Sequence, residues 1–166
     1  MASADPLPLR VMHRLVEDAR EVPGVKGAEY DRAVRAKADK YPWMRLYDAR
    51  RHVYAGIDMN GVILIRLCVG VAIIFRFTPG EDETMRTIGN RLLAAFVQLF
   101  LVKDQKRIDE TEEVEFTLVR GDDGTPTFDC NIVSYEPEQP DLGCVQGAFA
   151  VEFYCPDDDL YSQTAA

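Results

Sequence analysis

The chain has 166 residues and a formal net charge of −9, with 47% hydrophobic and 28% charged residues. This length and composition are typical of one globular domain and exclude a disordered chain, and no metal or disulfide is needed to complete such a core. The acidic balance argues against nucleic acid and anionic membranes as general partners. The charge is uneven, because residues 1–80 carry 13 Lys and Arg against 9 Asp and Glu, whereas residues 81–166 carry 6 against 19.

The N-terminal part predicts a flexible start followed by an amphipathic helix. Residues 1–6 show neither the basic nor the apolar region of an export signal, so we expect a cytoplasmic protein with reduced cysteines. Over residues 9–20 an apolar stripe recurs at helical spacing, and Pro23-Gly24 ends the helix. The stripe consists of Val11, Met12, Leu15, Val16 and Ala19.

A second helix is predicted over residues 28–39. Tyr30, Val34 and Ala38 follow one another at a spacing of four, and Pro42 disfavours helical backbone in the residue before it. This prediction gives the chain two N-terminal helices.

From Arg51 the hydrophobic period changes from helical to two, which predicts strands. Residues 51–58 form the first strand, and Asn60-Gly61 is the strongest hairpin signal, since a type I′ turn requires positive φ at both central residues. Residues 62–68 return as the partner strand. Gly70 marks a bulge, bend or turn before another strand over 71–77.

One long central helix is predicted to follow. Thr78 and Glu81 have the spacing of a capping box, and Pro79 suits the first helical position. Lys103, Lys106 and Arg107 complement the negative end of the helix dipole. The apolar stripe between these ends consists of Met85, Ile88, Leu92, Phe96, Leu99 and Val102.

The remaining segments predict strands and an acidic tail. Residues 114–118 and 127–132 alternate in polarity, 136–147 is expected as a loop, and 149–155 is the last strand before the tail 156–166. The predicted order is α-α-β-β-β-α-β-β-β in a single domain over 1–166. The fold class is therefore α+β, with a mainly antiparallel sheet of five to six strands, two N-terminal helices and one long central helix.

The sequence predicts no catalytic, cofactor or metal site. His13 and His52 are the two histidines, and the cysteines lack the paired spacing of a structural zinc site. Glycine motifs for nucleotides are absent. Among the thiols, Cys144 in its glycine-flanked loop is expected to be exposed, whereas Cys130 and Cys155 have the parity of core residues.

Acid–base chemistry on a shared sheet face is a further option. It depends on whether several carboxylates converge, which their spacing leaves open. The carboxylates concerned are Asp58, Glu113, Glu115 and Glu152.

The stretch Arg32–Tyr54 interleaves basic and aromatic residues, and here we predict a partner-binding surface. Its residues are Trp43, Arg45, Tyr47, Arg50 and Arg51. Trp, Tyr and Arg dominate interface hot spots, which favours a protein partner. Single-stranded nucleic acid also suits such a pattern. A third interpretation is that the rings cap the core while the charges stay in water.

The predicted element order is similar to the core of type III secretion chaperones, which are small, acidic and dimeric. It is equally compatible with cystatin-like or profilin-like folds. From these observations we expect a non-enzymatic protein-interaction module, acting as a subunit or chaperone-like component of a complex and binding a protein partner or a second copy. The alternative is a small-molecule-binding or acid–base enzyme domain with a pocket between the long helix and the sheet.

Overall fold

The computed structural model describes residues 5–30, 38–49, 53–56, 61–78, 80, 82–103, 105–107, 115–136, 139–156 and 159–160. These residues form two α-helices, one short 3-10 helix and eight strands. In chain order the elements are α1 (Leu7–Arg20), β1 (Gly27–Tyr30), η1 (Ala38–Lys40), β2 (Trp43–Asp48), β3 (Val53–Gly56), β4 (Val62–Arg76), α2 (Asp82–Val102), β5 (Gln105–Arg107), β6 (Glu115–Leu118), β7 (Asp129–Glu136) and β8 (Gln139–Pro156).

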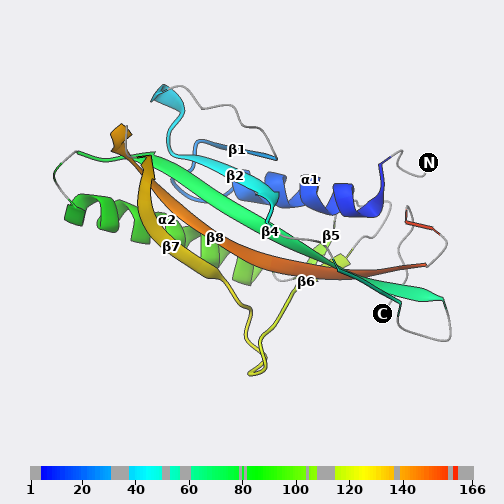
Figure 1. Ribbon diagram of the computed structural model, residues 1–166. Coiled ribbons are helices and arrows are strands. Elements are labelled where there is room, and N and C mark those ends of the chain that lie inside the picture. The colour runs from blue at the N-terminus through cyan, green and yellow to red at the C-terminus, as the bar shows by residue number, and fades with distance from the viewer. Residues whose placement is uncertain are drawn as a thin grey trace.

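Two long strands, β4 and β8, form the centre of one mixed sheet. They pair antiparallel along the whole of β4, from Val62 opposite Pro156 to Arg76 opposite Leu142. The other edge of β4 is shared by β2 and β3, and the other edge of β8 by β6 and β7. β1 joins β2 in parallel, and every other pairing between the described strands is antiparallel. The two central strands curve through the whole molecule (Figure 1).

Alternation along β4 divides the sheet into two faces. Odd-numbered residues of β4, from Ile65 to Phe75, are fully buried and belong to the main core. Met44 of β2 and Val145 of β8 both pair with Ile73, so they share this face. The core also contains the apolar stripes of α1 and α2, and both helices therefore cover the same side of the sheet. The even-numbered residues of β4 point to the opposite side.

Aromatic rings fill the space between α2 and the sheet. Phe96 and Phe100 of α2 lie 5.8 and 5.4 Å, by ring centroids, from Phe149 of β8, and Phe128 lies 5.6 Å from both Phe96 and Phe149. At the end of α2, Leu101 and Val102 are exposed. By length and composition alone, Thr84–Val102 would suffice to cross a membrane, and 22% of its most apolar stretch is buried in the fold.

An ion-pair cluster joins α1 to the end of α2. Asp18 of α1 is 1% exposed, and its Oδ1 lies 3.3 Å from Lys103 Nζ and 3.5 Å from Arg14 Nε. Lys103 also pairs with Glu21. Burial alone would lower the pKa of Lys103, but the hydrogen bond to Glu21 and the charge of Asp18 outweigh it and raise that pKa.

The α+β class and both main helices are confirmed, since α1 covers the predicted 9–20 and α2 the predicted long helix. Of the three basic residues predicted to stabilise the end of this helix, only the first lies next to it. Lys103 follows α2 directly, whereas Lys106 and Arg107 lie on β5. The proposed cap residue Glu81 lies outside the described residues.

The predicted second helix over 28–39 is wrong. Gly27–Tyr30 is a strand that pairs with β2, Ala38–Lys40 is a single 3-10 turn, and 31–37 lie outside the described residues. Trp43–Asp48, which we assigned to no element, is the strand β2. A spacing of four at Tyr30, Val34 and Ala38 was too short a pattern to outweigh pairing with a neighbouring strand.

Two predicted breaks in the strands are also wrong. The path across the sheet, β1-β2-β4-β8-β6-β5, has six strands, within the predicted five to six, and β3 and β7 pair beside this path to make eight. Strand β4 continues through Gly70, and residues 139–147, predicted as part of a loop, belong to β8. In both places glycine allows another group to approach closely, since a Cβ on Gly70 would lie 2.4 Å from the Tyr47 ring and one on Gly143 would lie 2.6 Å from Phe75.

The predicted hairpin between residues 51–58 and 62–68 corresponds to β3 and the first half of β4. Gly56 pairs with Ile63, so the connection lies within residues 57–62. Gly61 has a φ of 71°, the positive value that the turn prediction requires of it. Asn60 lies outside the described residues.

Candidate docking surface

The side of the sheet opposite α1 and α2 is the candidate site. No described helix covers it (Figure 1). We call this side the open face and define it by the strand register of β2, β4, β8 and β7. One row across it is Tyr47, Gly70, Ala148 and Asp129, and the next is Arg45, Ala72, Gln146 and Asn131.

Three of the five predicted partner-binding residues lie together on this face. Trp43, Arg45 and Tyr47 alternate along β2 with Met44 and Leu46, which are fully buried in the main core. Their three side chains are half-buried. The other two predicted residues, Arg50 and Arg51, lie outside the described residues.

Glycines on neighbouring strands make room for the two aromatic rings. Gly27 of β1 pairs with Trp43, and a Cβ built on Gly27 would lie 2.4 Å from the indole ring. Gly70 of β4 pairs with Tyr47, and a Cβ there would also lie 2.4 Å from the phenol ring. Both rings therefore lie down across the sheet instead of standing away from it. Their faces are presented outward.

Cations lie over these aromatic rings. The Arg45 guanidinium carbon is 5.3 Å from the centroid of the Tyr47 ring, and Lys40 Nζ is 5.8 Å from that of Trp43. Both distances fall within the range of a cation–π contact. Among the described residues, the indole Nε1 of Trp43 and Nε of Arg45 are buried donors with no hydrogen-bond partner.

One end of the open face has a small apolar cluster of its own. Its buried members are Tyr41, Ile74, Leu142 and Cys144, and Trp43, Ala72 and Val133 pack against them. Trp43 therefore covers part of a core while remaining partly accessible. The capping and docking interpretations of Trp43 are compatible, because each describes a different side of its ring.

The middle of the open face is lined by small side chains and is hollowed. One hollow of about 300 Å³ lies between Tyr47 and Asp129, over Ala148. A second of about 290 Å³ lies beside it, between Cys68 and Thr127. These hollows let the backbone of a partner approach the sheet closely.

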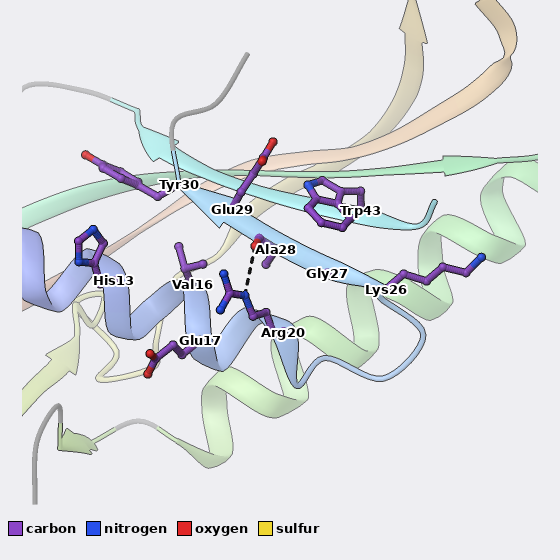
Figure 2. A pocket seen from close by; sticks show the side chains of 10 residues that line it. All are labelled: His13, Val16, Glu17, Arg20, Lys26, Gly27, Ala28, Glu29, Tyr30 and Trp43. Atoms are coloured by element: carbon purple, nitrogen blue, oxygen red, sulfur yellow. Dashed lines mark hydrogen bonds between the residues drawn. The ribbon is translucent and has the colours of Figure 1, made fainter. Parts of the chain in front are cut away.

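A separate groove of about 750 Å³ runs between α1 and β1 (Figure 2). His13 and Tyr30 meet at one end in an edge-to-face contact of 6.4 Å between centroids. Near the middle, Arg20 Nε donates to the carbonyl oxygen of Ala28 at 3.3 Å. Trp43 lines the groove as well, so it stands where the groove and the open face meet.

One of the predictions for the cysteines, that for Cys144, is wrong. Cys144, expected in an exposed loop, is a buried residue of β8, and burial raises the pKa of its thiol to about 12. Cys155 is buried as expected, and Cys130 is half-buried. Cys68 is a half-buried thiol on the open face and lines its second hollow.

The proposed acid–base carboxylates do not form a described cluster. Asp58 and Glu113 lie outside the described residues. Glu152 of β8 pairs with Arg66 at 3.1 Å, and Glu115 lies on the neighbouring strand β6. In the described part of the chain no group of three or more histidine, cysteine or acidic side chains is placed to hold a metal ion.

Comparison with known proteins assigns the chain to no family. No protein-family model matches it, and no curated protein is significantly similar to it. The open face and the groove are therefore the features that bear on its function.

Proposed function

We propose that this protein is a non-enzymatic interaction module, a subunit or chaperone-like component of a protein complex, and that the open face is its docking surface. The observation that carries the proposal is the placement of Trp43, Arg45 and Tyr47 on the side of the sheet that no described helix covers. Aromatic residues and arginine supply most interface hot spots.

The arrangement of the rings favours a preformed surface. Because Trp43 lies over Gly27 and Tyr47 over Gly70, neither ring is free to collapse toward the sheet or needs ordering when a partner arrives. Side chains fixed in advance lose less rotamer entropy on binding.

Site-specific photo-crosslinking in the source cells tests this proposal. A crosslinking amino acid at Tyr47 should capture a defined protein, whereas the same group at Arg91, exposed on α2, should not. The Tyr47 product should disappear when Trp43→Ala and Arg45→Glu are added and persist with Arg86→Glu, a charge reversal at an exposed position of α2. Equal capture from both positions would contradict docking at the open face.

A small-molecule binder is the second candidate, and the groove between α1 and β1 favours it. Its volume of about 750 Å³ is typical of a ligand site. The groove lies away from the interface between α2 and the sheet, where we expected such a pocket and where phenylalanine rings are packed. Native mass spectrometry of the purified chain tests this candidate: a bound metabolite lost in Arg20→Ala would support it, and an unliganded mass would exclude a tightly held ligand.

A further inference from the structure

We propose that a second copy of this chain binds the open face, with the two open faces packed against each other around a two-fold axis. This inference deepens the proposed function, on which it rests, by naming the occupant of the docking surface. It follows from how charge and side-chain size are distributed across the four strands of the face.

Two charges on the open face form no ion pair within the described part of the chain, and they have opposite signs. Arg66 pairs with Glu152, and Arg76 with Asp141. Among the described residues, Arg45 on β2 and the exposed Asp129 on β7 have no oppositely charged side chain within 4 Å. Glu29 of β1 stands opposite Arg45 in the register without forming an ion pair with it.

These two charges lie at opposite margins of the face. Strands β2 and β7 are separated by β4 and β8, so their backbones are ~14 Å apart at the usual strand spacing. A salt bridge between them within one chain is therefore excluded. The row that ends in Asp129 begins with Tyr47, and the Arg45 guanidinium stacks over the Tyr47 ring. The Arg45 guanidinium therefore reaches from its own row to the row that ends in Asp129.

A two-fold axis parallel to the strands, between β4 and β8, makes this row complementary to itself. Such an axis lays β2 of each copy over β7 of the other. Tyr47 and the stacked Arg45 of one copy then face Asp129 of the second copy, and the same pair forms again at the other end of the row. An interface of this kind is isologous, so one chain supplies both halves of each contact.

The middle of the row permits close approach. Between Tyr47 and Asp129 stand only Gly70 and Ala148, and in the neighbouring row Ala72 is small whereas Gln146 is longer and exposed. Two sheets packed face to face lie about 10 Å apart, and small side chains in the centre leave the margins to make the specific contacts.

The size of the face predicts a reversible dimer. Four strands and six residues along each define a patch of roughly 19 by 20 Å, or about 400 Å² before surface relief is counted. Side chains that project from the sheet increase this area. The total surface area buried by two copies is then about 1,000 Å², at the low end of specific interfaces. We therefore expect association that depends on protein concentration.

Sedimentation velocity of the full chain over a concentration series tests the inference. Wild type should shift from monomer to dimer as concentration rises. Arg45→Glu and Asp129→Arg should each raise the dimer Kd on the order of a hundredfold, since like charges then face each other twice. An equimolar mixture of these two variants should regain the wild-type Kd, because their heterodimer contains two opposite-charge pairs.

The controls carry the same charge changes elsewhere. Arg86→Glu on α2 and Asp122→Arg in the turn before β7 are exposed and should dimerise as wild type does. Recovery in the mixture also shows that both interface variants are folded. A wild type that stays monomeric, or a dimer that either interface reversal leaves intact, overturns the inference. If the chain stays monomeric but still crosslinks another protein through Tyr47, the proposal of a second copy is refuted, whereas the proposed docking function is retained.

Discussion

The contact between Gly70 and the Tyr47 ring predicts an unusual response to a conservative substitution. Gly70→Ala adds one methyl group within a central strand, where replacing glycine by alanine ordinarily stabilises a protein by about 0.5–1 kcal/mol. In this protein the new Cβ would lie 2.4 Å from two atoms of the phenol ring. The ring must leave its position over the backbone, and Arg45 loses the surface on which it stacks.

The size of the effect follows from two opposing contributions. Overpacking costs about 1–3 kcal/mol, and the half-buried Tyr47 can relieve part of it by rotating into water. Against the ordinary gain of alanine, we expect a net loss of about 0.5–2 kcal/mol in the free energy of unfolding. In a Tyr47→Ala background the obstruction is gone, so Gly70→Ala should be neutral or stabilising there.

Urea unfolding of the four proteins in this double-mutant cycle provides the measurement. The coupling free energy between positions 47 and 70 should be about 1–3 kcal/mol, and it should be unfavourable when Gly70→Ala is combined with the native Tyr47. Gly70→Ala should also weaken crosslinking through the open face, because the ring that presents the surface is displaced. Additive effects in the cycle would show that the ring does not lie over Gly70 and would refute the argument for a preformed surface.

Three further predictions concern the frame of the fold. Lys103→Met should lower stability at neutral pH by about 1 kcal/mol, because Arg14 keeps part of the charge on Asp18 balanced. Because the folded pKa of Lys103 is raised above 10.5, its contribution to the free energy of unfolding is complete below that pH and is lost as the pH rises through the folded pKa. Chemical denaturation from pH 8 to 12 should therefore show a loss of stability in wild type that is absent from Lys103→Met. At pH 8, iodoacetamide should modify Cys68 well before Cys144, whose pKa of about 12 leaves on the order of one thiol in ten thousand ionised, and peptide mapping that finds Cys144 labelled first would contradict its burial. Gly61→Val should cost about 1–3 kcal/mol in thermal or urea unfolding, because a β-branched residue is strained at a φ of 71°, and an unchanged stability would show that this conformation is not required.

Local patterns predicted the elements whose residues largely determine their own structure. Helix α1 follows from an apolar stripe at helical spacing, and α2 from a longer one. The short strand β1 has no comparable signal in Gly-Ala-Glu-Tyr, since it exists through parallel pairing with β2. Strand propensity depends on such neighbours more than helix propensity does. Residues 139–147 were missed for the same reason: proline and glycine indicate a turn locally, yet the full length of β4 offers a partner for every one of them from Leu142 onward.

The sequence predicted part of the candidate site. The part that it did not predict is a contact between residues that lie far apart in the chain. Residue type alone selected Trp43, Arg45 and Tyr47, and their alternation with Met44 and Leu46 is visible in the sequence once a strand is assumed. What makes their rings a preformed surface is the glycine opposite each ring, and those glycines stand 16 and 23 positions away along the chain.

Such pairing becomes visible only when the strand register is known. Without the register, Gly27 and Gly70 look like points where structure ends, because glycine most often marks a turn or a break. With it, each glycine is the position at which a side chain must be absent for the neighbouring ring to lie flat. The two interpretations predict different effects of Gly70→Ala. At a break, the added methyl group would be accommodated whether residue 47 is tyrosine or alanine. Beneath a ring, its cost must depend on residue 47.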